Sequence, residues 1–336
     1  MKLQDEMKGK MILVTGGTGT IGSYLVKKLL EYEVEVVRVF SRDEHKQYEM
    51  QENFAIQNGG VDKRLRFLLG DVRDKERLKR AMEGIDIVFH LAALKHVPAC
   101  EYNPSEAVKT NVIGTQNIID CAIEANVSAV VYASTDKAAS PTNTMGASKL
   151  LAERLIVSAA EGWKGPRDIK FLSVRFGNVL NSRGSVIPLF KRQIDAGGPV
   201  TVTDNNMTRF VMNIDRAVDL MLKSLRISRR GEVFVFKMPV IRIGDLAQAM
   251  VELAPKPVEF INIGLRPGEK LYEELMTEEE SSRSFETEDM FIILPYNSDF
   301  NQCMDTYKGA LRAQIGSYSS AEEPIMAIEE IKTMLL

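Results

Sequence analysis

The sequence is poor in the residues that build metal and redox sites. It has three cysteines and three histidines among 336 residues. Cys100, Cys121 and Cys303 lie far apart and match neither a metal-ligand spacing nor a redox spacing. We therefore expect no metal site and a cytoplasmic location, where thiols stay reduced.

The chain also lacks the features of membrane proteins and of nucleic-acid-binding proteins. No apolar run approaches the roughly 18 residues that are needed to span a bilayer. The charged first ten residues do not resemble a signal peptide. A formal net charge of −3 gives no reason to expect nucleic-acid binding. We expect neither membrane insertion nor a nucleic-acid partner.

What is present in the first half is an alternation of short apolar runs with helical patterns. The apolar runs predict strands at 11–14, 34–40, 65–69, 85–91, 127–133, 169–176 and, further on, 232–236. Nearly continuous apolar strands that alternate with helices are typical of a parallel sheet covered on both faces. The pattern predicts the α/β class, with a doubly wound parallel sheet.

A glycine-rich stretch, VTGGTGTIG, lies between the first predicted strand and the first predicted helix. Glycines in this context indicate a dinucleotide-binding turn. Gly16 would allow the tight turn, Gly19 would let the pyrophosphate approach, and Gly22 would let helix and strand pack closely. The amides of Thr20 and Ile21 would bind phosphate at the helix N-terminus.

The second predicted strand ends in FSRDE, at the point where NAD-binding sites usually carry a carboxylate. Ser41 and Arg42 stand there, and a hydroxyl beside a forked guanidinium suits the 2′-phosphate of NADP. The alternative is a solvated charged turn. Asp71, after the third strand, could reach the adenine amino group. We expect tightly bound NADP, in contact also with Val72, Ala92, Ala93 and Lys95.

After Phe176 the pattern changes to a stretch rich in Gly, Asn, Ser and Thr, which suits loops around a ligand. We expect a Rossmann-type NADP-binding domain formed by 1–178 and about 207–237. A smaller α/β substrate-binding lobe would comprise about 179–206 and 238–336. The tail predicts a docked helix that begins at Pro324.

Several longer motifs occur in a fixed order along the chain. They are TGGTGTIG, FSRDEHKQ, ALKHVPACEYNPSEAVKTNVIGTQN, STDKAASPTN, RFGNVLNSRGSVIPLF, VTVTDNNMTRF and GLRPGEKLYEEL. Together they resemble the extended short-chain dehydrogenase/reductase superfamily and, within it, the UDP-N-acetylglucosamine 4,6-dehydratases of surface-glycan synthesis. The resemblance implies a UDP-sugar substrate, NADP and a homo-oligomer, either a dimer or larger. The helix that begins near Met145 is a candidate for the subunit interface.

The reaction that the resemblance implies removes water from the sugar without net oxidation. Hydride leaves C4 and later returns to C6, while a base takes the C5 proton and an acid helps the C6 hydroxyl leave. The resemblance implies that Thr135 bonds the C4 oxygen, that Asp136 is the C6 acid, and that Lys137 is the C5 base if burial lowers its pKa. Without the resemblance, this stretch would be read as a charged turn that ends a strand.

Met145 departs from the superfamily, in which a tyrosine four residues before Lys149 is the acid–base group for C4. Methionine cannot exchange a proton. We therefore expect Asp136 to take the C4 proton, through Thr135, and then to pass it to the C6 hydroxyl. Lys149 would keep its bond to the nicotinamide ribose. Met145 would pack beside the nicotinamide.

Further residues are expected to bind the substrate. Arginines would pair with the two UDP phosphates, and Glu269 would bond the ribose or the uracil. Each of these residues could instead form a surface ion pair. The predicted substrate residues are Lys95, His96, Asn178, Arg183, Ser185, Arg209, Arg266 and Glu269. His90, inside an apolar strand, is expected to be a core histidine.

Two other functions remain open. A UDP-hexose 4-epimerase is disfavoured by the missing tyrosine, and a non-catalytic NADP-binding scaffold or sensor is disfavoured by Asp136 and Lys137. The stereochemistry at C5 also stays open. NSRGSVIPLF resembles inverting relatives, whereas GLRPGEKLYEEL resembles retaining ones.

Overall fold

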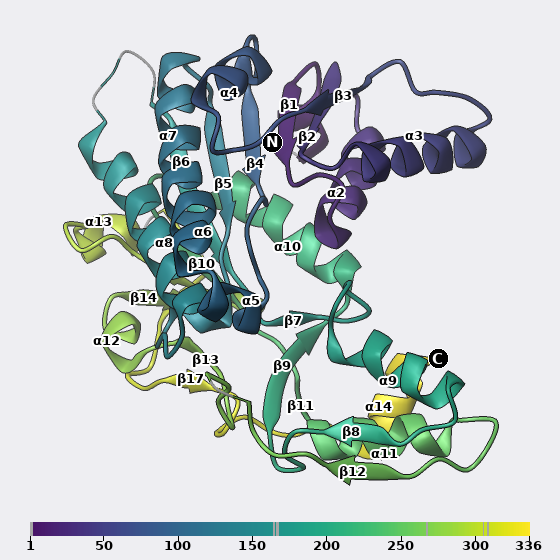
Figure 1. Cartoon of the computed structure of the whole chain (residues 1–336). Coiled ribbons are helices and arrows are strands. Elements are labelled where there is room, and N and C mark those ends of the chain that lie inside the picture. The colour runs from purple at the N-terminus through teal and green to yellow at the C-terminus, as the bar shows by residue number, and fades with distance from the viewer. Residues whose placement is uncertain (1–2, 164, 166–167, 267, 305, 308) are drawn as a thin grey trace.

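A ten-stranded sheet forms the centre of the computed structural model, which describes residues 3–163, 165, 168–266, 268–304, 306–307 and 309–336 (Figure 1). Its strand order is β16 (Leu311–Arg312), β14 (Ser284–Glu286), β15 (Met290–Ile293), β10 (Val233–Phe236), β6 (Lys170–Arg175), β5 (Ala129–Ala133), β4 (Ile87–His90), β1 (Met11–Thr15), β2 (Val36–Ser41) and β3 (Leu65–Leu69). Neighbours from β10 to β3 run parallel. This order confirms the predicted doubly wound α/β fold.

Helices cover both faces of the sheet, which explains why its central strands are mostly buried and apolar. One face carries α1 (Leu3–Met7), α2 (Thr20–Leu30), α3 (Glu44–Asn58) and α10 (Ile214–Ile227). The other face carries α4 (Lys75–Met82), α7 (Gly114–Glu124) and α8 (Thr144–Gly162). All four residues of β4 are buried, as a strand between two helical layers requires.

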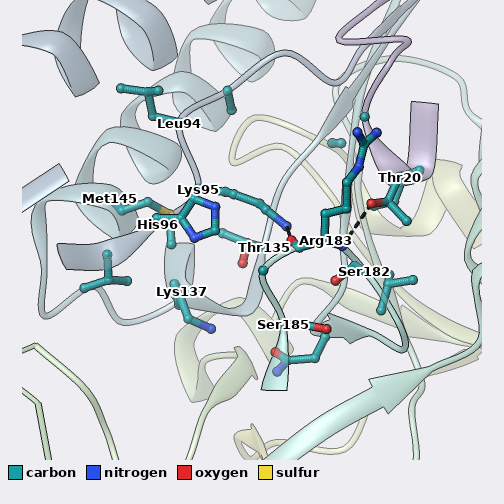
Figure 2. Close-up of a pocket in the computed structure, with 18 of the residues that line it drawn as sticks. Thr20, Leu94, Lys95, His96, Thr135, Lys137, Met145, Ser182, Arg183 and Ser185 are labelled. Atoms are coloured by element: carbon teal, nitrogen blue, oxygen red, sulfur yellow. Dashed lines mark hydrogen bonds between the residues drawn. The ribbon is translucent and has the colours of Figure 1, made fainter. Parts of the chain in front are cut away.

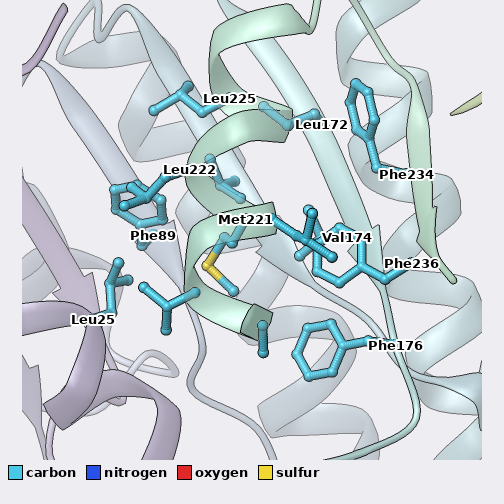
Figure 3. Close-up of a cluster of buried hydrophobic side chains, with 14 of the residues drawn as sticks. Leu25, Phe89, Leu172, Val174, Phe176, Met221, Leu222, Leu225, Phe234 and Phe236 are labelled. Carbon is cyan, nitrogen blue, oxygen red and sulfur yellow. The ribbon is translucent and has the colours of Figure 1, made fainter. Parts of the chain in front are cut away.

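The larger hydrophobic core lies under α10. Figure 3 shows Met221, Leu222 and Leu225 of this helix pointing toward aromatic and aliphatic side chains of the sheet, including Phe89 and Val174. These side chains are fully buried or nearly so. Their burial fixes the sheet rigidly, so the loops at its carboxyl end start from defined positions.

A smaller lobe contains α9 (Val186–Asp195), α11 (Ile243–Glu252), α14 (Ile328–Leu335) and the pair β8 (Val200–Val202) and β12 (Phe260–Asn262). It has its own apolar cluster, to which α9, α11 and α14 contribute Phe190, Leu246 and Ile331. Two small sheets connect the lobe to the rest: β11 (Val240–Arg242), β9 (Thr208–Met212) and β7 (Asn178–Val179), and β13 (Glu274–Met276) with β17 (Tyr318–Ser319).

Short helical segments complete the described elements. They are α5 (Val97–Tyr102), α6 (Pro104–Ala107), a π-helical segment (Val108–Ile113), one 3₁₀ turn (Asp136–Ala138), α12 (Glu278–Ser281) and α13 (Phe300–Met304). No helix in the described part of the chain is long and apolar enough to cross a membrane.

Two features differ from the expectations. The tail helix begins at Ile328 and not at Pro324, because Met326 donates its N–H to the Val240 carbonyl (2.8 Å) and so keeps the preceding residues extended. In addition, β14, β15 and β16 lie within 238–336 but belong to the large sheet, since β15 pairs antiparallel with β10. The remainder of the domain division stays a prediction.

Candidate functional site

A cleft of about 940 Å³ lies at the carboxyl end of the parallel strands, between the large sheet and the smaller lobe. Ligands bind at this edge in folds of this kind. Every site residue predicted from the sequence lines this cleft: Gly16, Gly19, Thr20, Ile21, Gly22, Ser41, Arg42, Asp71, Val72, Ala92, Ala93, Lys95, His96, Thr135, Asp136, Lys137, Met145, Lys149, Asn178, Arg183, Ser185, Arg209, Arg266 and Glu269.

The glycine-rich loop is packed too tightly for side chains at two positions. Gly16 has φ 67°, and a Cβ there would lie 2.8 Å from the Ala92 nitrogen. At Gly22 a Cβ would lie 2.4 Å from the Gly16 carbonyl oxygen, because α2 leaves the loop directly against the end of β1. Gly19 is the N-cap of α2. The first amides of the helix therefore face the cleft beside a loop whose backbone a ligand can approach.

Arg42, at the end of β2, has a guanidinium that is accessible to a ligand. Asp43 accepts hydrogen bonds from the Lys46 backbone (3.0 Å) and ammonium (2.6 Å), so its role is to cap α3. Ser41 accepts from Gln47 Nε2 at 3.0 Å. The Arg42 side chain is 52% exposed and has one long contact, 3.4 Å, with Asp71. Ser41 and Arg42 thus lie together at the rim of the cleft.

Asp71 is engaged by the neighbouring Arg73. One carboxylate oxygen accepts from the Arg73 guanidinium at 2.7 and 2.9 Å, and the other accepts the Arg73 backbone N–H at 3.0 Å. Burial raises the pKa of Asp71, but the hydrogen bonds from Arg73 outweigh burial and hold the pKa below its ordinary value. Asp71 is therefore a charged, fixed group, and its proposed bond to adenine would share oxygens that Arg73 already uses.

Thr135, Asp136 and Lys137 follow β5 and form a hydrogen-bonded row. Asp136 is 1% exposed, and its Oδ1 accepts from Thr135 Oγ1 (2.7 Å), from the Lys137 backbone (2.9 Å) and from Lys137 Nζ (3.0 Å). Among the described residues, Asp136 Oδ2 has no hydrogen-bond partner. A buried carboxylate oxygen without a partner is costly, so this atom is a candidate contact for a ligand.

A residue that the sequence did not single out, Glu273, completes the row. Its Oε1 lies 3.1 Å from Lys137 Nζ, and its side chain is 3% exposed. Glu273 stands just before β13, and no spacing in the sequence links it to Lys137. The motif GEKLYEEL contains three glutamates, and the sequence prediction of a substrate-binding residue names Glu269 and not Glu273.

The two carboxylates reverse the expected direction of the Lys137 pKa. Burial alone would lower it, but Asp136 and Glu273 outweigh burial, and the net pKa is raised above its ordinary value. The condition that burial should make Lys137 a free base is therefore wrong. Lys137 is an ammonium at neutral pH, so it needs to transfer a proton before it can accept one.

Lys149 and Met145 lie on α8, beside the row. Lys149 Nζ donates to the Ala133 carbonyl at 2.6 Å and lies 4.2 Å from the centre of the Tyr132 ring. Burial lowers the pKa of Lys149 to about 7. Met145 is 4% exposed and packs in a small apolar cluster with Leu94, Val97, Cys100 and Ala107. Methionine therefore fills an apolar wall of the cleft.

His90 is a core residue, as expected. Its ring nitrogens lie 2.7 Å from Thr15 Oγ1 and 3.1 Å from Thr115 Oγ1. Burial lowers its pKa to about 3, with a smaller effect of Lys149 in the same direction. A neutral histidine with both nitrogens bonded has a structural role.

Lys95 and Arg183 meet across the cleft (Figure 2). Lys95 Nζ donates to the Arg183 carbonyl at 2.6 Å, and the Arg183 N–H donates to Thr20 Oγ1 at 3.1 Å. The Arg183 guanidinium also donates to the Thr18 carbonyl. Arg183 thus contacts the glycine-rich loop. A Cβ at Gly184 would lie 2.6 Å from the His96 ring, so His96 packs on the same segment.

Arg209 and Arg266, the two arginines predicted to bind phosphate, differ in how accessible their guanidinium groups are to a ligand. Arg209 donates to the carbonyls of Thr208 (2.7 Å) and Lys270 (2.8 Å) and lies 3.9 Å from Glu273, so most of its donors are used. A bidentate phosphate contact from Arg209 is therefore disfavoured. Arg266 is exposed, and its backbone N–H bonds Glu269 at 3.2 Å. The neighbouring Pro267 lies outside the described residues.

Asn178 and Ser185 lie on either side of the loop that carries Arg183. Asn178 begins β7, and Ser185 is the N-cap of α9. The Ser185 hydroxyl is buried and, within the described chain, has no hydrogen-bond partner. It is thus available to a ligand.

No cluster of His, Cys, Asp and Glu among the described residues could hold a metal ion. The described side chains therefore offer acid–base groups and anion-binding groups. A doubly wound sheet with a glycine-rich turn, and an Asp–Lys row at its carboxyl edge, is typical of nucleotide-binding enzymes of the extended short-chain dehydrogenase/reductase type.

Comparison with known proteins gives the family. Residues 12–295 match the polysaccharide biosynthesis protein family. The chain is 42% identical to a UDP-N-acetylglucosamine 4,6-dehydratase (inverting) of Campylobacter jejuni over 96% of both chains. It is 39% identical to a UDP-glucose 4-epimerase of Rickettsia conorii, over 97% of this chain and 95% of that one. The chain belongs to the polysaccharide biosynthesis protein family, which confirms the resemblance found in its motifs.

Solved structures agree with this assignment. Pen from Bacillus thuringiensis superposes with a TM-score of 0.90 at 46% identity, over 98% of this chain and 97% of that one. A dTDP-glucose 4,6-dehydratase from Streptomyces venezuelae, solved with NAD and TYD bound, gives a TM-score of 0.68 at 25% identity, over 78% and 86% of the two chains. Both solved structures thus share the architecture described above.

Proposed function

We propose that the protein is a UDP-N-acetylglucosamine 4,6-dehydratase that uses tightly bound NADP and feeds surface-glycan synthesis. The observation that carries the proposal is the hydrogen-bonded Thr135–Asp136–Lys137 row, in which Asp136 is buried and its Oδ2 has no hydrogen-bond partner among the described residues. The row lies at the edge where sheets of this kind bind ligands. The relative from C. jejuni bears the name of this activity.

The cleft fits a nicotinamide dinucleotide. The amides at the N-terminus of α2, which begins after the tightly packed glycine-rich turn, would bind the pyrophosphate, and Lys149 would bond the nicotinamide ribose. Ser41 and the half-exposed Arg42 suit a 2′-phosphate, although the S. venezuelae dehydratase was solved with NAD. When bound, the cofactor would supply reversible hydride transfer, which the described side chains cannot provide.

The residues of the row would move the protons. Asp136, directly or through Thr135, would accept the proton of the C4 hydroxyl and would later give it to the departing C6 hydroxyl. Lys137 would remove the C5 proton and return it. Met145 cannot take part, so the apolar wall that it forms would exclude water from the reacting carbons. Lys95, His96 and Ser185 would hold the sugar nucleotide.

Water loss tests the proposal directly. Purified protein incubated with UDP-N-acetylglucosamine should give a product lighter by one water in mass spectrometry, while the cofactor shows no net change. UDP-N-acetylgalactosamine without water loss would favour the 4-epimerase, for which the Rickettsia relative is the specific support. No conversion in the presence of bound cofactor would favour a scaffold or sensor. Proton NMR of the product would give the C5 configuration.

The cofactor choice has its own test. Arg42→Glu would place a carboxylate beside the ribose, so we expect it to lower the affinity for NADP and to spare that for NAD, as measured by fluorescence titration. Equal effects on both cofactors would contradict the role of Arg42.

The proposal also includes a cytoplasmic homo-oligomer, a dimer or larger. Apolar side chains are exposed on neighbouring helices near the cleft, with Ile113 at 49% and Leu151 on α8 at 51%. Covering such side chains would favour association of subunits. Light scattering coupled to size-exclusion chromatography would give the subunit number.

A further inference from the structure

The Lys137 ammonium lies between the buried carboxylates of Asp136 and Glu273, and the proposed mechanism gives a role to Asp136 but not to Glu273. Nζ is 3.0 Å from Asp136 Oδ1 and 3.1 Å from Glu273 Oε1. Within the described structure, Glu273 Oε2 has no hydrogen-bond partner. The function proposed for the row uses Asp136 and Lys137 but leaves this second carboxylate unexplained.

Two hydrogen bonds to Ser320 hold the backbone of Glu273 in place. Its N–H donates to Ser320 Oγ at 2.9 Å, and its carbonyl accepts the Ser320 N–H at 2.9 Å. Arg209 Nε lies 3.9 Å from the same Oε1 atom, and its guanidinium is fixed by backbone carbonyls. A carboxylate that is anchored at both peptide groups can present the same oxygen to Lys137 throughout a reaction.

The order of proton transfers leaves Glu273 as the acceptor for Lys137. Once Asp136 has accepted the C4 hydroxyl proton, it can take no other until the C6 hydroxyl leaves. Lys137 has to lose a proton before it can remove the C5 proton. Of the described carboxylates in contact with its ammonium, only Glu273 then remains.

We propose that Glu273 is the proton acceptor that turns Lys137 into the C5 base, so that Glu273 acts through Lys137 and does not touch the sugar. This inference rests on the proposed dehydratase function. A proton moves from Lys137 Nζ to the Glu273 carboxylate, and the neutral amine then takes the C5 proton. After C5 is reprotonated by the ammonium, Glu273 returns its proton to the amine, and both residues regain their starting charges.

The electrostatics of the row are consistent with this sequence. Burial lowers the pKa of Lys137, whereas Asp136 and Glu273 raise it more strongly, and Arg209 lowers it slightly. Protonation of Asp136 removes one of the two raising charges. The ammonium therefore becomes easier to deprotonate only after the first proton transfer, which couples C5 chemistry to C4 oxidation.

The test compares Glu273→Gln with Glu274→Gln as a matched control. The glutamine side chain has nearly the volume of glutamate and keeps an oxygen for Lys137, but it cannot accept a proton. Glu274 is the next residue, and its carboxylate bonds Ser140 and not Lys137. Rapid mixing with UDP-N-acetylglucosamine separates two readouts: the near-ultraviolet absorbance of reduced nicotinamide reports C4 oxidation, and mass spectrometry reports water loss.

In Glu273→Gln we expect C4 oxidation within about fivefold of wild type and water loss slower by about 10²–10³-fold, so that reduced nicotinamide accumulates. Water loss in the variant should rise with pH, because solvent has to deprotonate Lys137, whereas the wild-type rate stays nearly flat between about pH 7 and 9. Glu273→Asp should recover part of the loss, and Glu274→Gln should stay within about threefold of wild type for both readouts.

The outcomes distinguish this inference from the proposed function. If Glu273→Gln slows C4 oxidation and water loss equally, Glu273 has a structural role. If water loss keeps its wild-type rate and does not depend on pH, Glu273 has no role in the reaction. Either result would overturn the inference while the dehydratase function stands. If the wild-type protein releases no water from the substrate, both proposals fall together.

Discussion

Replacement of Asp136 by asparagine should abolish turnover and leave the fold intact. Asparagine has the same shape and can still accept the three hydrogen bonds that Thr135 and Lys137 donate to Oδ1. Each bond to a neutral acceptor is weaker by about 1 kcal/mol than one to a charged acceptor, which gives a loss of stability of at most about 3 kcal/mol. Relief from burying a charge offsets part of it.

The catalytic loss should be far larger, because Asp136 serves two proton transfers. General acid–base catalysis contributes about 10²–10⁴-fold for each step, so we expect a fall in kcat of about 10⁴-fold or more. The C4 step should fail first, so mixing with UDP-N-acetylglucosamine should give neither reduced nicotinamide nor water loss. This outcome differs from that of Glu273→Gln, in which C4 oxidation is preserved.

Cofactor binding supplies the control for Asp136→Asn. The variant should retain NADP with wild-type affinity, as measured by fluorescence titration. Asp74→Asn is a matched substitution outside the cleft, since Asp74 caps α4 through Arg77 N–H and asparagine caps helices as well. Turnover within about tenfold of wild type in Asp136→Asn, or a normal rate of C4 oxidation, would refute the assignment of Asp136.

Three further substitutions, with one control, test other buried side chains of the protein. Glu280→Ala leaves the fully buried Arg175 with one carboxylate partner, so we expect a loss of about 3–5 kcal/mol in chemical denaturation, against about 0–1 kcal/mol for Glu279→Ala, whose side chain is 57% exposed. The pKa of Lys149 is lowered from 10.5 to about 7 in the folded protein, so the unfolded chain binds more protons between these values. The stability of the cofactor-free protein should therefore rise with pH above about 7, by up to about 1.4 kcal/mol per pH unit. Lys149→Met should remove that rise in urea titrations at several pH values, and a rise that persists would contradict burial as its cause. Met145→Ala should lower turnover by no more than about tenfold, because methionine only packs, and complete loss of activity with intact folding would contradict this role.

Much of the site could be predicted because its parts are local in sequence. The glycine-rich loop joins a strand to the helix that follows it, and Gly16 and Gly22 are required by contacts only a few residues away or with the adjoining strand end. Asp136 and Lys137 are adjacent and follow a strand. Such features produce motifs, so the glycine-rich loop could be predicted from neighbouring residues, and the roles of Asp136 and Lys137 could be proposed from the resemblance of their motif to a known family.

The parts that were missed depend on distant segments. Glu273 reaches Lys137 because β13, paired with β17, lies beside the turn that follows β5. Arg209 donates its hydrogen bonds to carbonyls near β13, so fewer of its N–H groups remain for a ligand. Strand β15 joins the large sheet, although its sequence would suit either lobe. Contacts between segments that are distant in the sequence leave no characteristic spacing or periodicity.

The order of residues along the chain predicts the class of fold and the glycine-rich turn, because apolar periodicity and glycine placement act through neighbouring residues. The roles proposed for the row of Thr135, Asp136 and Lys137 rest on the resemblance of its motif to a known family. The charge state of that row, in contrast, follows from how distant segments are packed. The pKa of a buried amine depends on every charge within a few ångströms, and in this protein the second carboxylate beside Lys137 comes from a segment far along the chain. Lys137 is for that reason an ammonium held between two carboxylates and not a free base.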